Sequence, residues 1–306
     1  MFCRSTKKKQ RFKEKIKNNI EFIKFKDLFN LLKEIKNLKI LIISLTPFSF
    51  FISLVCIIFG ADKKNIFLFL RSDGFLEYKA KFGNIGYIIY GIMFYILKNK
   101  TKILSCSKFL TGASKSKILF PSEIDSDWLK NRKIIKKKFD NKKIRLLYIG
   151  RFREEKGYLN LINIFKDLNI NSSLRMIGND YKHFKKKFYP KNPNIKISGQ
   201  LVKNKELIKC YDNCDIFILP SYAEAYPQVI LESLSRLKPV IVFNEIKFLK
   251  KTFSVGVYSS PRNTKGLQKV INMIIFNYSK IQNRIFKQKI FTQENFFIEM
   301  NKTFNS

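Results

Sequence analysis

From Lys143 onward, short β-branched segments alternate with longer amphipathic segments. A parallel sheet with crossover helices is built from this alternation, because each strand is followed by a helix that covers the sheet. The pattern predicts strands at 144–149, 173–177, 194–198, 215–219 and 239–243. It predicts helices at 158–168, 181–188, 203–211, 228–237, 265–277 and 293–304. We therefore expect an α/β domain in this half of the chain.

A first candidate site is the segment Gly150-Arg-Phe-Arg-Glu-Glu-Lys-Gly157, which follows a predicted strand and opens a helix. Open α/β sheets bind their ligands at such strand ends. Arg151 and Lys156 offer two cations beside helix N-terminal amides, a combination that suits a diphosphate. Basic residues are common throughout this chain, so the loop alone leaves a solvated turn as the alternative.

A second candidate site runs from Pro220 to Glu232 and again joins a predicted strand to a helix. Glu224 falls in the loop, whereas Glu232 lies one to two turns inside the helix. Carboxylates accept hydrogen bonds from vicinal hydroxyls, so a sugar and a ribose are suitable ligands. Helix capping and dipole complementation are the alternative for two acids near a helix N-terminus.

Glu224 and Glu232 are separated by seven residues, and they occur together with Arg151, Lys156-Gly157 and Lys238-Pro-Val-Ile. This ordered set resembles the donor-binding half of the family 4 glycosyltransferases, also called glycosyl transferases group 1. The resemblance implies an α/β GT-B fold, with two Rossmann-like domains and a donor cleft between them. It also implies sugar transfer with retention of configuration.

The resemblance implies a role for each matching position. Arg151 and Lys156 would hold the donor diphosphate and stabilise the departing nucleotide, and Glu224 would bind the transferred sugar. Glu232 would bind the ribose hydroxyls. The implied catalytic residues are Arg151, Lys156 and Glu224, and the implied donor-binding residues are Gly150, Arg151, Lys156, Glu224, Ala225, Tyr226 and Glu232. No metal and no cofactor are expected beyond the nucleotide diphosphate sugar, because side-chain cations can neutralise the leaving group.

The N-terminal half follows the family pattern less closely. We predict a helix at 26–36, strands at 38–45, 66–70 and 103–105, and helices at 48–59 and 86–97. No strand with a Gly-rich loop precedes Lys39, so the first strand–loop unit is expected to be missing or altered. Arg71 and Asp73 follow a predicted strand and are the acceptor-side candidates. The predicted domains are 1–130 and 143–306, joined by a Lys-rich linker at 131–142.

Residues 40–61 carry no charge and are numerous enough to cross a bilayer. The alternative is a buried strand, a turn and a buried helix in succession. Thr46-Pro47 interrupts the apolar run, and proline starts a helix more readily than it continues one. We therefore expect the soluble arrangement.

The formal net charge of +37 indicates an anionic partner or a compositional drift toward Lys, Ile, Asn and Phe. An anionic membrane surface is the partner that we favour. No nucleic-acid-binding motif accompanies the charge, so we expect no nucleic acid partner. Five scattered cysteines and a single histidine, His183, indicate neither a disulfide framework nor a metal site.

These features together predict a retaining glycosyltransferase that uses a nucleotide diphosphate sugar. The acceptor would be a saccharide or lipid-linked molecule of cell-envelope polysaccharide or lipopolysaccharide assembly. The expected location is cytoplasmic, at the inner face of the membrane. The main alternative is a truncated relative that binds the nucleotide sugar without transferring it. An epimerase of the same architecture is a further alternative, although it would normally need additional acid–base residues.

Overall fold

The computed structural model describes residues 38–107, 110, 116–134, 143–179, 192–199 and 204–305. The chain divides into two compact units, one formed by Met1–Pro121 with Phe297–Ser306 and the other by Ser122–Phe296. The predicted helices at 26–36 and 181–188 lie outside the described residues, as does His183. The proposed loss of a first strand–loop unit also concerns residues before 38, which are not described.

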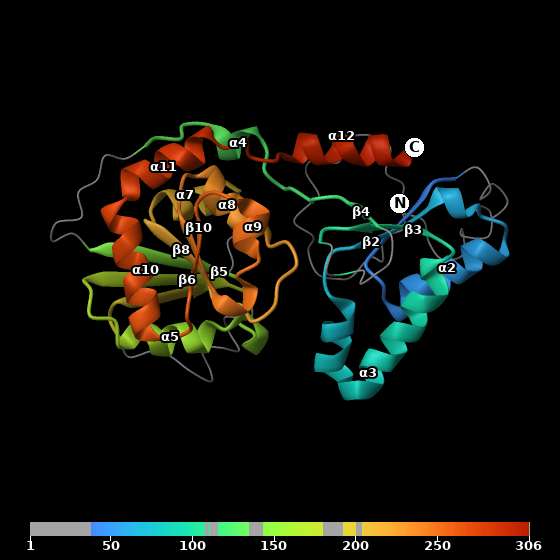
Figure 1. Cartoon of the computed structure of the whole chain (residues 1–306), viewed down its shortest axis with the longest axis horizontal. Coiled ribbons are helices and arrows are strands. Elements are labelled where there is room, and N and C mark those ends of the chain that lie inside the picture. The colour runs from blue at the N-terminus through green and yellow to red at the C-terminus, as the bar shows by residue number, and fades with distance from the viewer. Residues whose placement is uncertain are drawn as a thin grey trace. The chain divides into compact units, whose positions relative to one another are not determined.

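The second unit is built on a six-stranded parallel sheet with the order β10-β9-β8-β5-β6-β7. Its strands are β5 (Ile144–Ile149), β6 (Ser172–Gly178), β7 (Ile195–Gly199), β8 (Ile216–Leu219), β9 (Val240–Phe243) and β10 (Val257–Ser260). Its main helices are α5 (Tyr158–Lys166), α7 (Asn204–Asp212), α8 (Gln228–Ser235), α9 (Leu249–Phe253), α10 (Thr264–Phe276) and α11 (Tyr278–Lys287). Figure 1 shows α5 and α8 on opposite faces of this sheet, which explains why the central strands are apolar on both faces.

The strand order reverses between β5 and β8. From β5 the chain adds β6 and β7 on one side, whereas β8, β9 and β10 extend the sheet on the other side. Such a reversal leaves a crevice at the carboxyl ends of the two central strands, where open α/β sheets bind ligands. The loops that follow β5 and β8 are the two candidate segments identified from the sequence.

All the strands predicted after residue 143 are confirmed, with bounds within one residue of the prediction. The missed strand and α-helices after residue 143 are β10, α9 and α11, and the short elements β4 (Lys117–Ile118) and α4 (Ser126–Leu129) before it were missed as well. The sequence of β10, Val257-Tyr-Ser-Ser260, is short and half polar, so it lacks the signal of a buried strand. Helix α11 follows α10 after the single residue Asn277, where the predicted helix ended, and no helix was predicted for its residues.

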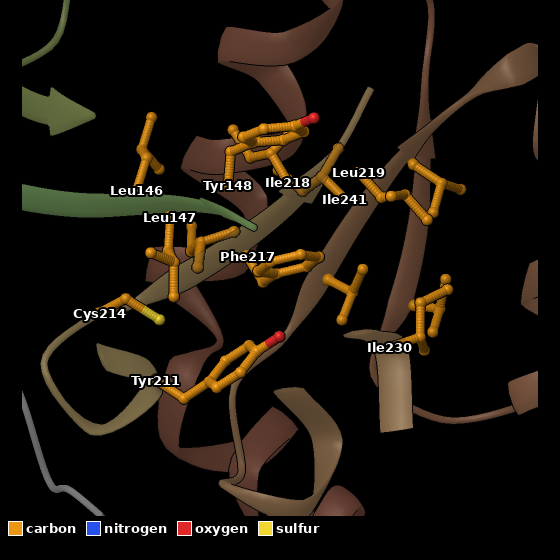
Figure 2. Packing of buried hydrophobic residues seen from close by; sticks show 14 of the residues in the cluster. Leu146, Leu147, Tyr148, Tyr211, Cys214, Phe217, Ile218, Leu219, Ile230 and Ile241 are labelled. Atoms are coloured by element: carbon orange, nitrogen blue, oxygen red, sulfur yellow. The ribbon is translucent and has the colours of Figure 1, made fainter. Parts of the chain in front are cut away.

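The core of the second unit gathers aromatic rings from different elements (Figure 2). Tyr211 of α7 lies 5.6 Å, ring centre to ring centre, from Phe217 of β8. The indole of Trp128, in α4 (Ser126–Leu129), contacts Tyr211 at 5.7 Å. These contacts tie α4 to the second unit.

The buried guanidinium of Arg236 strengthens the attachment of α4. It pairs with Asp212 at 2.8 Å and donates hydrogen bonds to the carbonyl oxygens of Trp128 and Lys130. The compact unit therefore begins at Ser122, earlier than the predicted boundary at 130. Residues 135–142 of the predicted linker lie outside the described residues.

The first unit contains a four-stranded parallel sheet with the order β1-β2-β3-β4. Its strands are β1 (Ile40–Ile43), β2 (Ile66–Leu70), β3 (Lys102–Ser105) and β4 (Lys117–Ile118), and its helices include α2 (Pro47–Ile58) and α3 (Gly74–Lys98). The uncharged segment 40–61 is thus a strand, a turn and a helix, as expected, but the helix is not buried as expected, because Phe48, Phe51 and Ile58 are exposed. Thr46 caps α2 in a capping box with Ser49, and Pro47 occupies the first turn.

Helix α3 is longer than predicted. It begins at Gly74, where the prediction began at residue 86, and its backbone breaks at Gly83 with φ 64° and ψ −153°. The charged residues Glu77, Lys79 and Lys81 obscured the apolar pattern of its first segment.

The last helix, α12 (Gln293–Phe304), was assigned to the second domain from the sequence. Its bounds are as predicted, but its C-terminal part packs with the first unit. The ring of Phe304 lies 4.6 Å from that of Phe67 in β2, and Lys39 Nζ donates to Asn305 at 2.8 Å. The last ten residues consequently belong to the first compact unit, a pairing that no local pattern encodes.

Candidate functional site

The loop after β5 follows a path set by small residues and by one tyrosine. A Cβ atom at Gly178, at the end of β6, would overlap the carbonyl oxygen of Gly150. Beneath the loop, Tyr148 Oη donates a hydrogen bond to the carbonyl oxygen of Arg151 at 2.8 Å. Burial, and secondly the charge of Glu224, raise the pKa of Tyr148, so this phenol stays a donor at neutral pH. The loop is therefore supported from its own strand.

At its far end this loop closes against the second candidate loop. A short 3-10 turn, Glu154–Lys156, leads to Gly157, whose φ of 65° lies in the left-handed region. A Cβ atom at Gly157 would overlap the carbonyl oxygen of Pro220. The Tyr222 N–H donates to the carbonyl oxygen of Glu155 at 3.0 Å. Glycine is therefore required both for the turn into α5 and for the approach of the loop after β8.

Lys156 and Glu224 are brought together by this approach. Lys156 Nζ lies 2.6 Å from Glu224 Oε1, and Ser221 Oγ donates to the same oxygen at 2.7 Å. The two charged side chains are only 19% and 13% exposed, respectively. A shielded ion pair thus occupies the strand-order reversal, and the sequence did not indicate Ser221 as part of it.

Arg262 holds the loop after β8 by hydrogen bonds to its backbone. Its guanidinium donates to the carbonyl oxygens of Pro220 at 2.8 Å and Ser221 at 3.2 Å, and it stacks 4.0 Å from the centre of the Tyr222 ring. Its Nε donates to Glu245 at 2.7 Å, and this hydrogen bond holds the pKa of Glu245 below its usual value. One planar cation therefore fixes the backbone that carries Ser221 and Tyr222.

Sequence reasoning missed Arg262 because it missed β10. The residue follows that strand and precedes Asn263, which caps α10. The available signal was the position of Arg262 between the end of a strand and the N-cap of a helix. The same arrangement had identified the other two loops.

Arg151 occupies a more open position than Lys156. Its guanidinium lies 4.0 Å from the carboxylate of Glu155, and both side chains are about half exposed. Arg151 is thus held by a weak surface pair, from which an incoming anion can detach it at little cost.

Ala225 and Tyr226 form the half-buried turn before α8. Pro227 is the N-cap residue of this helix, and the ring of Tyr226 stacks on Phe253 at 4.9 Å. The backbone of this turn lies at a helix N-terminus, where amide groups and the helix dipole favour a negative ligand.

Glu232 is positioned by a buried tyrosine. Tyr211 Oη donates to Glu232 Oε2 at 2.7 Å, and Tyr211 is fully buried. Burial, together with the charge of Glu232, raises the pKa of Tyr211 well above its usual value, so the phenol remains protonated. Tyr211 was not predicted, because the sequence does not show that α7 packs beside α8.

The acceptor-side candidates Arg71 and Asp73 lie in the first unit, just after β2. Asp73 caps α3, with its Oδ1 accepting a hydrogen bond from the Leu76 N–H at 3.1 Å. Arg71 is exposed. Capping explains the presence of Asp73, and a role for either residue at the acceptor stays a prediction.

A family of known proteins matches most of the second unit. Residues 130–289, slightly more than half of the chain, match the family described as glycosyl transferases group 1. The chain belongs to this family. The matched residues include both candidate loops, Tyr211 and Arg262.

One curated relative is an uncharacterized 41.2 kDa protein in the cps region of Klebsiella pneumoniae, 26% identical over 180 residues. The alignment covers 58% of this chain and 46% of that protein, so the chain spans about half the length of the relative.

Solved structures share the fold. The Anabaena protein HepE, crystallised in complex with UDP-glucose, has a TM-score of 0.65 at 13% identity, over 91% of this chain and 81% of its own. WaaG, a glycosyltransferase involved in lipopolysaccharide biosynthesis, has a TM-score of 0.61 at 15% identity, over 90% and 80% of the two chains. The α/β architecture with two parallel sheets is that of the GT-B glycosyltransferases.

Proposed function

We propose that this chain transfers a sugar from a nucleotide diphosphate sugar to a saccharide or lipid-linked acceptor, with retention of configuration. The observation that carries the proposal is the shielded pair of Lys156 and Glu224 at the strand-order reversal. A cation for phosphate and a carboxylate for hydroxyls are the two groups that a nucleotide sugar needs close together.

Donor binding exchanges the partner of Lys156. Without donor, the ammonium group is neutralised by Glu224 at 2.6 Å. A diphosphate that enters beside the N-terminus of α5 competes for this ammonium group, and Arg151 adds a second cation from the open side. Glu224 is then available to accept hydrogen bonds from sugar hydroxyls, while Ser221 still orients its carboxylate.

The same cations stabilise the transition state. As the bond between the sugar and the diphosphate breaks, negative charge grows on the departing phosphate, and Lys156 and Arg151 neutralise it. We expect no metal ion to be required for this step. Retention means that the acceptor oxygen bonds to the face of the sugar that the nucleotide leaves, and the acceptor hydroxyl gives its proton to the departing diphosphate.

Glu232 would hold the nucleoside, because its carboxylate can accept hydrogen bonds from both ribose hydroxyls. The buried hydrogen bond from Tyr211 fixes the orientation of the carboxylate before the donor arrives. Arg71 and Asp73 of the first unit are the residues that we propose for contact with the acceptor.

The acceptor class is proposed from the relatives. WaaG is involved in lipopolysaccharide biosynthesis, and the Klebsiella relative is a protein of a cps region. We place this chain in cell-envelope polysaccharide or lipopolysaccharide assembly, at the cytoplasmic face of a membrane. The high net positive charge favours an anionic membrane surface there.

The test begins with a thermal-shift screen of UDP-, GDP-, ADP- and dTDP-sugars, followed by product formation from the labelled donor that stabilises the chain. We expect Arg151→Ala and Lys156→Ala to lower turnover at least tenfold, and Lys265→Ala, an exposed lysine on α10, to leave it unchanged. Undiminished turnover in both site variants would refute the mechanism.

Further readouts separate the finer parts of the proposal. The anomeric configuration of the product, read by NMR, tests retention, and an unchanged rate in EDTA tests independence from metal ions. Donor binding without turnover on any saccharide or lipid-linked acceptor would instead support the non-catalytic binding relative.

A further inference from the structure

The second segment of α3 carries an exposed apolar face. After the break at Gly83, six large side chains are exposed at helical spacing: Ile85, Ile88, Ile89, Ile92, Tyr95 and Ile96. Ile85 is 69% exposed and Tyr95 is 66% exposed. Intervals of three and four residues place these side chains on one side of a helix. Single exposed hydrophobic residues are ordinary on protein surfaces, but a continuous stripe marks an interaction surface.

The opposite face of the same segment is packed within the first unit. Tyr90, Phe94 and Leu97 are buried, and Phe75 of the preceding segment contacts the rings of Tyr90 at 4.8 Å and Phe94 at 5.8 Å. Figure 1 shows the two segments of α3 meeting at an angle. The helix is therefore held by its own unit with the apolar face directed outward.

This geometry suits a helix that lies on a bilayer rather than one that crosses it. Among the described residues, α3 is the one helix long and apolar enough to span a membrane. Its uncharged stretch, however, runs only from Phe82 to Leu97, about 24 Å of helix, which is shorter than a bilayer core of about 30 Å. The break at Gly83 and the buried opposite face also oppose a span. One face in the lipid is the arrangement that the packing permits.

The charges around this face favour an anionic partner. Between Gly74 and Lys102 the chain has one acid, Glu77, and five lysines: Lys79, Lys81, Lys98, Lys100 and Lys102. In the sequence, Lys79 and Lys81 precede the apolar segment, and Lys98 and Lys100 follow it. Lys102 belongs to β3, and its ammonium group lies over the Phe67 ring. Two exposed tyrosines, Tyr87 and Tyr95, suit the headgroup layer of a lipid surface. A second copy of this chain would bring equally charged lysines together, so charge complementarity favours an anionic lipid surface.

We propose that the exposed face of α3 is a membrane-docking surface that lies in the headgroup layer of an anionic bilayer. The apolar side chains enter the upper acyl region, and the flanking lysines bind anionic headgroups. The inference does not depend on the transfer reaction, because docking is measured without donor.

The experiment is co-sedimentation of the full chain with vesicles of phosphatidylglycerol and phosphatidylethanolamine, compared with neutral phosphatidylcholine vesicles. The double variant Ile88→Ser/Ile92→Ser should bind anionic vesicles about tenfold more weakly or worse. The matched control, Met273→Ser/Phe276→Ser, removes two exposed apolar side chains from α10 of the second unit and should bind as the parent chain does. All four positions are exposed, so folding should persist, as circular dichroism can verify.

Three results would overturn the proposal: no binding of the parent chain to anionic vesicles, equal binding to neutral ones, or an unchanged partition of the α3 variant. A parent chain that is dimeric by light scattering, and becomes monomeric in the α3 variant, would assign the face to a second copy instead. Donor binding is measured in parallel by thermal shift. Its absence in every variant would refute the proposed function while leaving the docking result intact.

Discussion

Gly157 joins the two candidate loops, and its replacement by alanine tests whether their close approach builds the site. The residue has a φ of 65°, and its α-carbon faces the carbonyl oxygen of Pro220. An alanine Cβ would overlap that oxygen and would lie 3.1 Å from Arg262 Nη1. The loop that carries Lys156 must therefore move away from the loop that carries Glu224.

The cost has two parts. The left-handed backbone costs alanine about 1–2 kcal/mol relative to glycine. Retreat of the Pro220 carbonyl also weakens its hydrogen bond from Arg262, a charged bond worth about 1.5–3 kcal/mol. We expect Gly157→Ala to lower the free energy of unfolding by about 2–4 kcal/mol. Because Lys156 adjoins the change, donor affinity should fall about 10- to 100-fold.

Two further variants separate backbone strain from the collision. Asparagine adopts positive φ more readily than alanine but carries a Cβ, so Gly157→Asn should also lose donor affinity. Gly83 also has a positive φ, of 64°, but a Cβ atom there would meet nothing within 4 Å. Gly83→Ala should therefore cost stability in the first unit through backbone strain alone, without changing donor affinity. The measurements are urea unfolding and calorimetric titration with the nucleotide sugar selected by thermal shift. Wild-type donor affinity in Gly157→Asn would refute the argument that the loops must touch at this glycine.

Other predictions follow from single contacts. Arg262→Lys removes the planar guanidinium that donates to the carbonyl oxygens of Pro220 and Ser221. The donor Kd, measured by calorimetry, should rise about tenfold, while the thermal unfolding temperature changes little. Tyr211→Phe should weaken binding of the nucleoside diphosphate selected by the screen several-fold, by about 1 kcal/mol, yet leave pyrophosphate binding unchanged, because only the ribose contact depends on Glu232. Arg236→Met should lower the free energy of unfolding in urea by about 2–4 kcal/mol, because it leaves the carbonyl oxygens of Trp128 and Lys130 without their buried donor. Burial raises the pKa of Tyr278, whose hydroxyl donates to the Asp215 carbonyl, so the unfolded chain releases this proton first. The contribution of the protonated Tyr278 to the free energy of unfolding is complete below about pH 10 and falls by about 1.4 kcal/mol per pH unit above it. Tyr278→Phe should therefore lose stability less steeply than the parent chain when the pH is raised.

The sequence by itself determined the local elements and the two candidate loops. Short, mostly apolar runs identified β2 and β5 with their observed bounds, because a strand buried on both faces is apolar along most of its length. The spacing of Glu224 and Glu232, taken together with Arg151, Lys156-Gly157 and the segment that begins at Lys238, carried the resemblance to the family. Where the local signal was weak, as in the half-polar β10 and in the charged first turns of α3, the element was missed or shortened.

Tertiary structure alone decided which groups meet. Lys156 and Glu224 are 68 residues apart, and they form a pair because β8 lies beside β5, an order that neither loop encodes. Arg262 reaches the same loop from the end of β10, and Tyr211 reaches Glu232 from a neighbouring helix. Likewise, the pattern of α3 predicted an apolar helix, but only packing showed which of its faces the protein covers. Periodicity reports the chemistry of one segment, whereas burial depends on the partner that the whole fold supplies.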